Sequence, residues 1–230
     1  MSDPWYAGPL VGFDTETTGI NPLTARPVSF AFVLHTPQDV FRIDHQLVNP
    51  RIPIPPATTA IHGITDDQVA DAMPVEEAVT YCVDKILRLS GEGIPIVGMN
   101  LAYDLTILNT LSMGRLEGWA GPCLDVMVLD KAVDKWRKGG RKLSDLVRAY
   151  DITTPGEAHD ATYDATASVL IVRAMAERFK RVRFQTPASL HTQQITWRAE
   201  QQADLSAYFV DRGKPPIDTR EMGWPTFTTT

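Results

Sequence analysis

The order of strand-like and helix-like patterns is the feature that most limits how this chain can fold. Three strand patterns come first, at Leu10 to Asp14, Pro27 to His35 and Val40 to His45, and they are close enough in sequence to form an antiparallel meander. A further strand at Ile94 to Val97, and a strand that runs into a helix at Cys123 to Val128, then alternate with helical patterns. That order predicts an α/β domain with a mixed central β-sheet flanked by helices.

The helical patterns place apolar residues on one face, as helices that pack against a sheet do. They cover Val75 to Leu87, Ala102 to Leu111, Lys142 to Tyr150 and Ala161 to Phe179. In the last of these, Ala165, Val169 and Val172 are expected to face inward. Arg51 to Thr59 is rich in proline and threonine and is expected to be a loop.

Length and composition indicate one domain with an appendage. The chain has 230 residues, and its composition changes beyond about Lys180, where glutamines become frequent. We expect a domain over residues 1–180 and a C-terminal extension over 181–230. The extension is expected to hold a helix from Gln193 to Phe209 and an irregular tail from Pro215 to Thr230.

The formal net charge of −6 argues against a protein that coats nucleic acid through bulk electrostatics. It does not exclude a nuclease, because acidic metal ligands contribute to that charge and bound divalent ions cancel much of it locally.

Cys82 and Cys123 lie in unrelated settings and favour buried free thiols in a reducing cytosol. The N-terminal residues do not follow the pattern of a signal peptide, and no apolar run approaches membrane-spanning length. We therefore expect a cytoplasmic protein with no membrane partner.

Asp14 and Glu16 end the first strand two residues apart, so their side chains share a face. Two carboxylates held together are costly unless a cation lies with them, and hard oxygen ligands favour Mg²⁺ or Mn²⁺. A solvated acidic strand end is the alternative interpretation of this spacing.

Another three residues, which occur later in the chain, add to this pair of carboxylates. Asp104 falls in the first turn of a helix that opens near Asn100, where an acid that stabilises the helix dipole is the ordinary alternative. His159 directly precedes the long helix and is otherwise a loop or capping histidine. Asp164 lies within the first two turns of that helix, near its apolar face, where a carboxylate needs a partner.

In this combination and order, the residues resemble the DEDDh 3′→5′ exonucleases. This DnaQ-like group includes the epsilon proofreading subunit of bacterial DNA polymerase III, RNase T and oligoribonuclease. Five segments match the family's motifs in order: Phe13 to Gly19, Ala60 to Thr65, Asn100 to Asp104, Lys142 to Leu146 and His159 to Asp164. The resemblance covers Leu10 to Phe179 and implies an RNase H-like fold.

The resemblance implies that Asp14, Glu16, Asp104 and Asp164 bind two divalent metal ions, Mg²⁺ or Mn²⁺. It gives His159 the role of taking the proton from the attacking water. The product would be a nucleoside 5′-monophosphate.

The resemblance also implies a set of residues that hold the 3′ end of the substrate: Thr15, Thr17, Thr18, Ile61, His62, Asn100 and Tyr103. Core packing is the alternative for Ile61 and Tyr103, and a simple turn for Thr17 and Thr18. Outside the motifs, Trp136 to Lys142 carries four cations that either follow the phosphate backbone or form a solvated basic loop.

The family favours DNA over RNA as the substrate, in proofreading or repair. An exoribonuclease similar to RNase T or oligoribonuclease stays open, because backbone contacts that the sequence does not show can sense the 2′-OH. A non-catalytic nucleic-acid-binding module is the alternative from another functional class. We expect the complete set of acids to count against it.

The extension is the expected contact to a replicative polymerase or a sliding clamp, with Gln185 to Leu190 as the candidate clamp peptide. Trp197 to Phe209 and Trp224-Pro225 are similar to the C-terminal region of actinobacterial epsilon-like exonucleases. This similarity suggests an actinobacterial protein or one from a related phage.

Overall fold

The computed structural model describes residues 4–36, 41–154 and 160–228 and is built on a six-stranded sheet with the order β4-β3-β2-β1-β5-β6. Its strands are β1 (Leu10–Thr17), β2 (Pro27–His35), β3 (Phe41–Asn49), β4 (Met73–Pro74), β5 (Ile96–Gly98) and β6 (Cys123–Asp125). The first three pair antiparallel as a meander, while β5 and β6 run parallel to β1. The carboxyl ends of β1, β5 and β6 therefore lie at one edge of the sheet.

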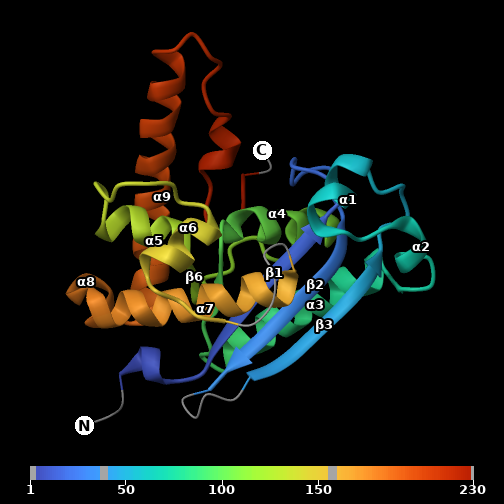
Figure 1. Cartoon of the computed structure of the whole chain (residues 1–230), viewed down its shortest axis with the longest axis horizontal. Helices are drawn as coiled ribbons and strands as arrows, with labels where there is room; N and C mark the ends of the chain where they lie inside the picture. The colour runs from blue at the N-terminus through green and yellow to red at the C-terminus, as the bar shows by residue number, and fades with distance from the viewer. Residues whose placement is uncertain (1–3, 37–40, 155–159, 229–230) are drawn as a thin grey trace.

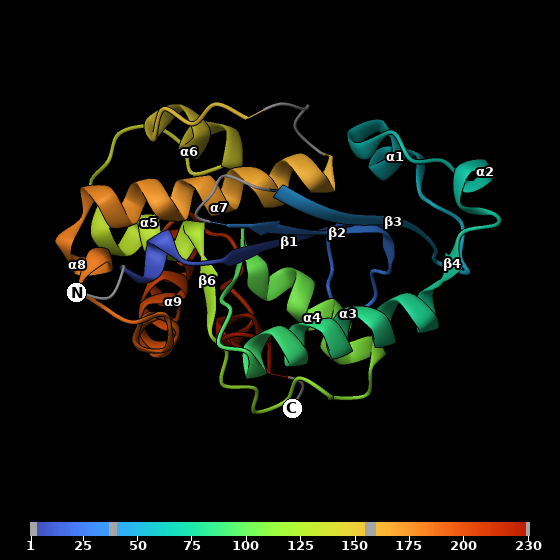
Figure 2. The ribbon, with the colours of Figure 1, turned by 90° about the horizontal axis from the view of Figure 1, so that it is seen from below.

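Helices cover both faces of this sheet. The helices of the described residues are α1 (Pro56–His62), α2 (Asp66–Val69), α3 (Val75–Gly91), α4 (Leu101–Leu111), α5 (Val126–Val133), α6 (Leu143–Ala149), α7 (Ala161–Arg178), α8 (Lys180–Arg183) and α9 (Pro187–Val210), with 3₁₀ turns η1 (Trp5–Ala7) and η2 (Thr219–Met222). Figures 1 and 2 show α7 against one face of β1 and β2, and α3 and α4 against the other. The predicted α/β architecture with a mixed sheet is confirmed.

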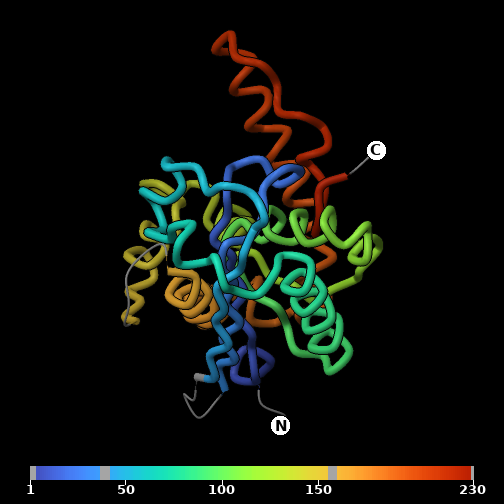
Figure 3. Tube along the Cα trace, turned by 90° about the vertical axis from the view of Figure 1, so that its right-hand side faces the viewer, coloured from blue at the N-terminus to red at the C-terminus, as the bar shows by residue number. Residues whose placement is uncertain are grey.

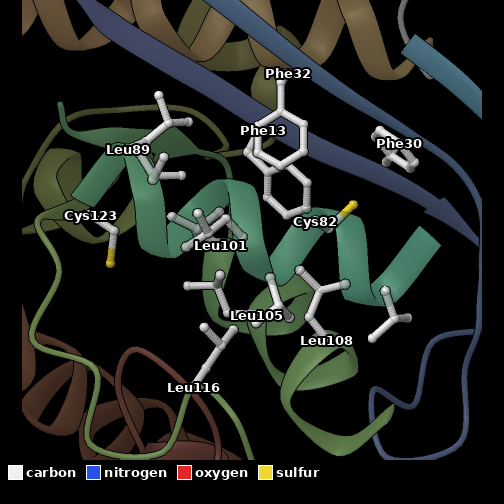
Figure 4. Close-up of a cluster of buried hydrophobic side chains, with 14 of the residues drawn as sticks. Phe13, Phe30, Phe32, Cys82, Leu89, Leu101, Leu105, Leu108, Leu116 and Cys123 are labelled. Atoms are coloured by element: carbon white, nitrogen blue, oxygen red, sulfur yellow. The ribbon is translucent and has the colours of Figure 1, made fainter. Parts of the chain in front are cut away.

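Two apolar cores follow from the alternation of side chains along β1. Phe13 points to the side of α3 and α4, where its ring lies 4.6 Å from that of Phe32 (Figure 4). Leu10, on the opposite face, packs in the core with Val169 and Val172 of α7. The inward face predicted for the long helix is confirmed. Cys82 and Cys123 are buried free thiols, also as predicted.

Gly12 brings α7 unusually close to β1. A β-carbon at this position would collide with the backbone carbonyl of Ala165. The small side chains of Ala161 and Ala165 are both fully buried beside the strand. This close approach matters for the site because Asp164 directly precedes Ala165 on the helix.

Two sequence predictions differ from the structure in their bounds. The loop expected over Arg51 to Thr59 is wrong in its second half, where α1 begins at Pro56. Proline is favourable at the first helical position, because its missing N–H has no partner there in any case, so a proline-rich stretch also precedes a helix. The helix expected from Gln193 begins earlier, at Pro187, for the same reason.

The third strand also differs from its predicted bounds. It extends to Asn49 because it continues to pair with β2 and then with β4. Its expected start at Val40 lies outside the described residues.

The C-terminal segment is attached to the domain on one side and projects on the other. α9 packs beside β6 and α5, and its far end, with the chain that returns from it, projects from the body of the molecule (Figures 1 and 3). The tail expected to be irregular contains η2 and buries Trp224. None of the helices in the described ranges has the length and apolar character needed to cross a bilayer.

Candidate active site

The end of β1 presents two carboxylates on the face that α7 covers. Asp14 and Glu16 are partly exposed, and the threonines that alternate with them are buried on the other face. Asp160 caps the start of α7, where its carboxylate accepts hydrogen bonds from the backbone N–H of Thr162 at 2.9 Å and of Tyr163 at 3.0 Å. This cap and the contact at Gly12 fix where α7 begins relative to β1.

Asp164 therefore lies over the end of β1. One carboxylate oxygen from each of Asp14, Glu16 and Asp164 lies within 4.8 Å of the other two. This is a donor set that fits a hard divalent cation, which takes oxygen ligands and needs them gathered in a small volume. The structure thus brings together three of the four predicted ligands as one cluster.

The fourth predicted ligand, Asp104, reaches the same strand end from the opposite face. It lies in the first turn of α4, is 4% exposed and accepts a hydrogen bond of 2.5 Å from the Thr15 hydroxyl. It is not a member of the 4.8 Å cluster. Its charge nevertheless raises the pKa of Asp14 more than the charge of any other acid does, so it belongs to the same electrostatic site.

Burial and mutual repulsion act together on these groups. The pKa of Asp14 is raised well above its ordinary value by burial and by Asp104 and Asp164. Burial and the same two acids raise the pKa of Glu16 to about 8. Burial raises the pKa of Asp104 to about 7 against the opposing hydrogen bond from Thr15. A bound cation would reverse this repulsion, since it stabilises the charged form of every carboxylate around it.

The predicted substrate residues near β1 form a connected turn. The Tyr103 and Thr17 hydroxyls share a hydrogen bond of 2.8 Å, and Tyr103 also donates to the carbonyl of Gly19. The Thr18 hydroxyl accepts from the backbone N–H of Arg26 at 3.1 Å. Burial raises the pKa of Tyr103 to about 12, which keeps this hydroxyl a donor. The substrate contacts of Thr15, Thr17, Thr18 and Tyr103 stay predictions, and all four side chains also hold the site together.

Two other predicted substrate residues lie on α1, and one opens α4. Ile61 is 56% exposed, which suits an apolar contact with a base. His62 accepts a hydrogen bond at Nδ1 from the backbone N–H of Ile64 at 3.0 Å. Asn100 takes a left-handed conformation, with φ of 54°, at the start of α4. Their substrate roles stay predictions.

His159 lies outside the described residues. Its role as the base that takes the proton from water stays a prediction.

The structure divides the four cations of the basic loop, Trp136 to Lys142, into two pairs. Arg137 and Arg141 both pair with the buried carboxylate of Asp130, at 3.0 and 2.8 Å. These two guanidinium groups therefore brace the loop, and Lys138 and Lys142 are the cations of the loop left for a phosphate backbone.

Several buried polar residues were missed by reasoning from sequence: Asp125, Asp130, Gln194 and Arg198. Asp125 had a local signal, since it ends a strand and caps the helix after it. The other three depend on partners elsewhere in the chain that no local pattern indicates.

A family model described as Exonuclease, of the RNase T type, matches residues 11–172. The chain belongs to this exonuclease family. An epsilon-like DNA polymerase III subunit from Rhodobacter capsulatus is 33% identical over 163 residues, which are 69% of this chain and 22% of that protein. The chain thus spans about a fifth of the length of that relative. The predicted membership of an enzyme family of exonucleases is confirmed, whereas an actinobacterial or phage origin stays a prediction.

Solved structures of exonucleases share the fold. Exonuclease X in complex with 5′ overhanging duplex DNA is 24% identical, with a TM-score of 0.53 over 78% of this chain and 99% of that one. Escherichia coli Exonuclease I in complex with a dA16 oligonucleotide is 17% identical, with a TM-score of 0.59 over 88% of this chain and 46% of that one. The predicted RNase H-like exonuclease fold is therefore confirmed.

Proposed function

We propose that this chain removes nucleotides from the 3′ end of DNA by hydrolysing phosphodiester bonds, and releases nucleoside 5′-monophosphates. The observation that carries the proposal is the cluster of Asp14, Glu16 and Asp164, whose ligand oxygens lie within 4.8 Å of one another beside buried Asp104. These four carboxylates would hold two divalent ions, Mg²⁺ or Mn²⁺. When bound, such ions stabilise the attacking and the leaving oxygens of the phosphodiester.

The protein's own residues would orient the substrate and move the proton. His159 would accept the proton of the attacking water, because imidazole is the side chain whose ordinary pKa lies nearest to neutral pH and is thus suited to a general base. Exposed Ile61 on α1 would pack against a base at the 3′ end. Asn100 and the braced turn of Thr17, Thr18 and Tyr103 would hold the terminal nucleotides.

DNA is the preferred substrate because the relatives point to it. The two solved exonucleases were captured with duplex DNA carrying a 5′ overhang and with a dA16 oligonucleotide. The relative from Rhodobacter capsulatus is named for a DNA polymerase III subunit. This supports a role in proofreading or repair, in the cytoplasm, with the polymerase as partner.

We propose that residues 1–180 form the exonuclease unit and residues 181–230 an extension. A sliding clamp as a further partner of the extension stays a prediction. The candidate clamp peptide enters α9, where Leu190 is fully buried, so it is not presented as an extended strand.

A substrate panel tests the proposal. Single-stranded DNA, duplex DNA with a mismatched 3′ end and RNA, each labelled at the 5′ end, are incubated with the protein and Mg²⁺ or Mn²⁺. The proposal predicts ladders that shorten from the 3′ end, faster on DNA than on RNA. Faster cleavage of RNA would make the chain an exoribonuclease. Binding without cleavage of any substrate, with either ion, would make it a non-catalytic module.

A further inference from the structure

The buried carboxylate of Asp125 joins the starts of two helices at the end of β6. It caps α5 by accepting hydrogen bonds from the backbone N–H of Met127 at 2.8 Å and of Val128 at 3.2 Å. It also accepts from the backbone N–H of Leu101 at 2.9 Å and of Asn100 at 3.3 Å. One side chain thus fixes the start of α4, the helix that carries Asp104.

Gln194 of α9 holds the backbone of this strand end. Its side chain is fully buried and accepts a hydrogen bond of 2.8 Å from the backbone N–H of Asp125. Its amide nitrogen donates to the carbonyl of Cys123 at 2.9 Å. The glutamine therefore pairs with β6 as a further strand would, although it lies 69 residues away in sequence.

Arg198, one turn further along α9, adds a positive charge. It is 3% exposed, and its attraction lowers the pKa of Asp125 against the rise that burial causes. Its guanidinium donates to the carbonyls of Gly223 at 3.2 Å and of Glu221 at 3.3 Å in the C-terminal tail. A buried glutamine and a buried arginine are costly unless they are paired, and here each is paired with groups that lead toward α4.

The tail then contacts α4 on the other side of Asp104. The backbone N–H of Phe227 donates to the hydroxyl of Thr106 at 2.8 Å, and Figure 1 shows the tail descending beside α4. The extension is therefore linked to α4 at two places. Gln194 reaches residues 100–101 through Asp125, and Phe227 is hydrogen-bonded to Thr106 directly. The matched family model ends at residue 172, before any of these extension residues.

We propose that Gln194 and Arg198 are positioning residues of the active site. Gln194 acts through Asp125, Arg198 acts through the tail that contacts Thr106, and both hold α4 and its ligand Asp104 in place. The extension is then part of the metal site's support as well as a tether to a partner. This inference rests on the proposed metal role of Asp104.

Three variants of the full chain test it. Gln194→Leu removes the hydrogen bonds to Asp125 and Cys123 of β6, and Arg198→Met removes those to the carbonyls of Gly223 and Glu221 in the tail. Gln201→Leu is the matched control, because Gln201 lies on the same helix and donates to the carbonyl of Val128 on α5 at 3.0 Å, but it does not touch Asp125. Mn²⁺ affinity by calorimetry, the thermal midpoint, kcat and KM are measured for each.

We expect Arg198→Met and Gln194→Leu to weaken Mn²⁺ binding by about 10-fold and to lower kcat more than they raise KM, since groups that orient ligands affect metal affinity by roughly 10–100-fold. Gln201→Leu should lower the thermal midpoint and leave Mn²⁺ binding unchanged. Unchanged Mn²⁺ binding in the first two variants, or an equal loss in Gln201→Leu, would overturn the inference.

Two further comparisons keep the test decisive. If neither variant folds, Gln194→Asn keeps the amide and shortens its reach, and the same criterion of Mn²⁺ binding applies to it. Wild type and Asp164→Ala are titrated alongside. If wild type does not bind Mn²⁺, the metal site itself is wrong; if wild type binds, Asp164→Ala does not and the Gln194 variants bind like wild type, only the positioning role is wrong.

Discussion

Two groups of carboxylates in this molecule have opposite electrostatic surroundings. Asp130 is fully buried and accepts hydrogen bonds from Arg137, Arg141 and the hydroxyl of Tyr150. Asp14, at the end of β1, has acids as its strongest charged neighbours, with Asp104 and Asp164 foremost.

The difference separates a structural cluster from the one for which we propose a metal-binding function. The protein supplies its own cations to Asp130, so that carboxylate ties a loop to α5. At the end of β1 it gathers carboxylates that repel one another and raise each other's pKa. Such an arrangement lowers stability unless a cation from outside the chain binds there. The contrast predicts that one cluster controls stability and the other controls activity.

Loss of a metal ligand should have the largest effect. Asp164→Ala removes a carboxylate from the cluster, and we expect near-total loss of exonuclease activity, by about 10³-fold or more, because metal stabilisation of the transition state is worth several kcal/mol. Chelation of the divalent ions should do the same. The rate of degradation of 5′-labelled DNA measures both, and activity that survives Asp164→Ala unaltered would show that the site is assigned wrongly.

Removal of the proposed base should have the next largest effect. His159→Ala should lower kcat by about 10²–10⁴-fold, the usual contribution of a positioned proton acceptor. Mn²⁺ binding should be mostly retained, since the four carboxylates are intact. Calorimetry on this variant checks the assignment, and the disappearance of Mn²⁺ binding would argue for a ligand in place of a base.

A matched pair of substitutions tests the contrast between the two clusters. Asp130→Asn should destabilise the fold by about 3–5 kcal/mol, because it leaves two partly buried cations without their charged partner, and should spare the activity of the folded protein. Asp14→Asn should abolish activity and raise the stability of the metal-free protein, because it removes repulsion. Urea unfolding in chelator measures both, and equal destabilisation by the two variants would refute the contrast.

The dependence of stability on pH should be the smallest effect. Without metal, the pKa of Glu16 is raised to about 8 and that of Asp104 to about 7, so the folded protein retains protons that the unfolded chain releases near pH 4. Stability is then greatest at low pH and is lost as pH rises through these folded-state values.

Thermal unfolding in chelator from about pH 5 to about pH 9 measures this effect, with a midpoint change of roughly 2–4 °C for each kcal/mol. The midpoint of wild type should fall across this range, less so for Asp14→Asn, and Mn²⁺ should restore it most at high pH. A midpoint that rises with pH in both proteins would contradict the cause given for these pKa values.

Local patterns predicted the elements that place the ligands. The alternation along β1 put Asp14 and Glu16 on one face of the strand. The helical spacing after residue 160 put Asp164 near the apolar face of α7, next to the inward-facing Ala165. Both depend on neighbours in sequence, so both were readable. The order of the motifs then indicated the metal-binding role that we propose for the cluster.

The residues that support the site were not predictable in the same way. Gln194 pairs with Asp125 across 69 residues, and Arg137 and Arg141 meet Asp130 where a helix and a loop fold together. A charge pattern alone cannot distinguish a guanidinium that pairs with a buried acid from one that faces solvent. The sequence therefore left the loop as either a surface that follows the phosphate backbone or a solvated basic loop, and did not separate its two arginines from its two lysines.

Titration of Mn²⁺ into the metal-free protein by calorimetry tests the central claim most directly, with Asp14→Asn and Asp130→Asn as the compared variants. We expect Mn²⁺ to bind wild type, to bind Asp130→Asn at a temperature where that variant is folded, and to bind Asp14→Asn weakly or not at all. Equal Mn²⁺ affinity in Asp14→Asn and wild type would contradict it.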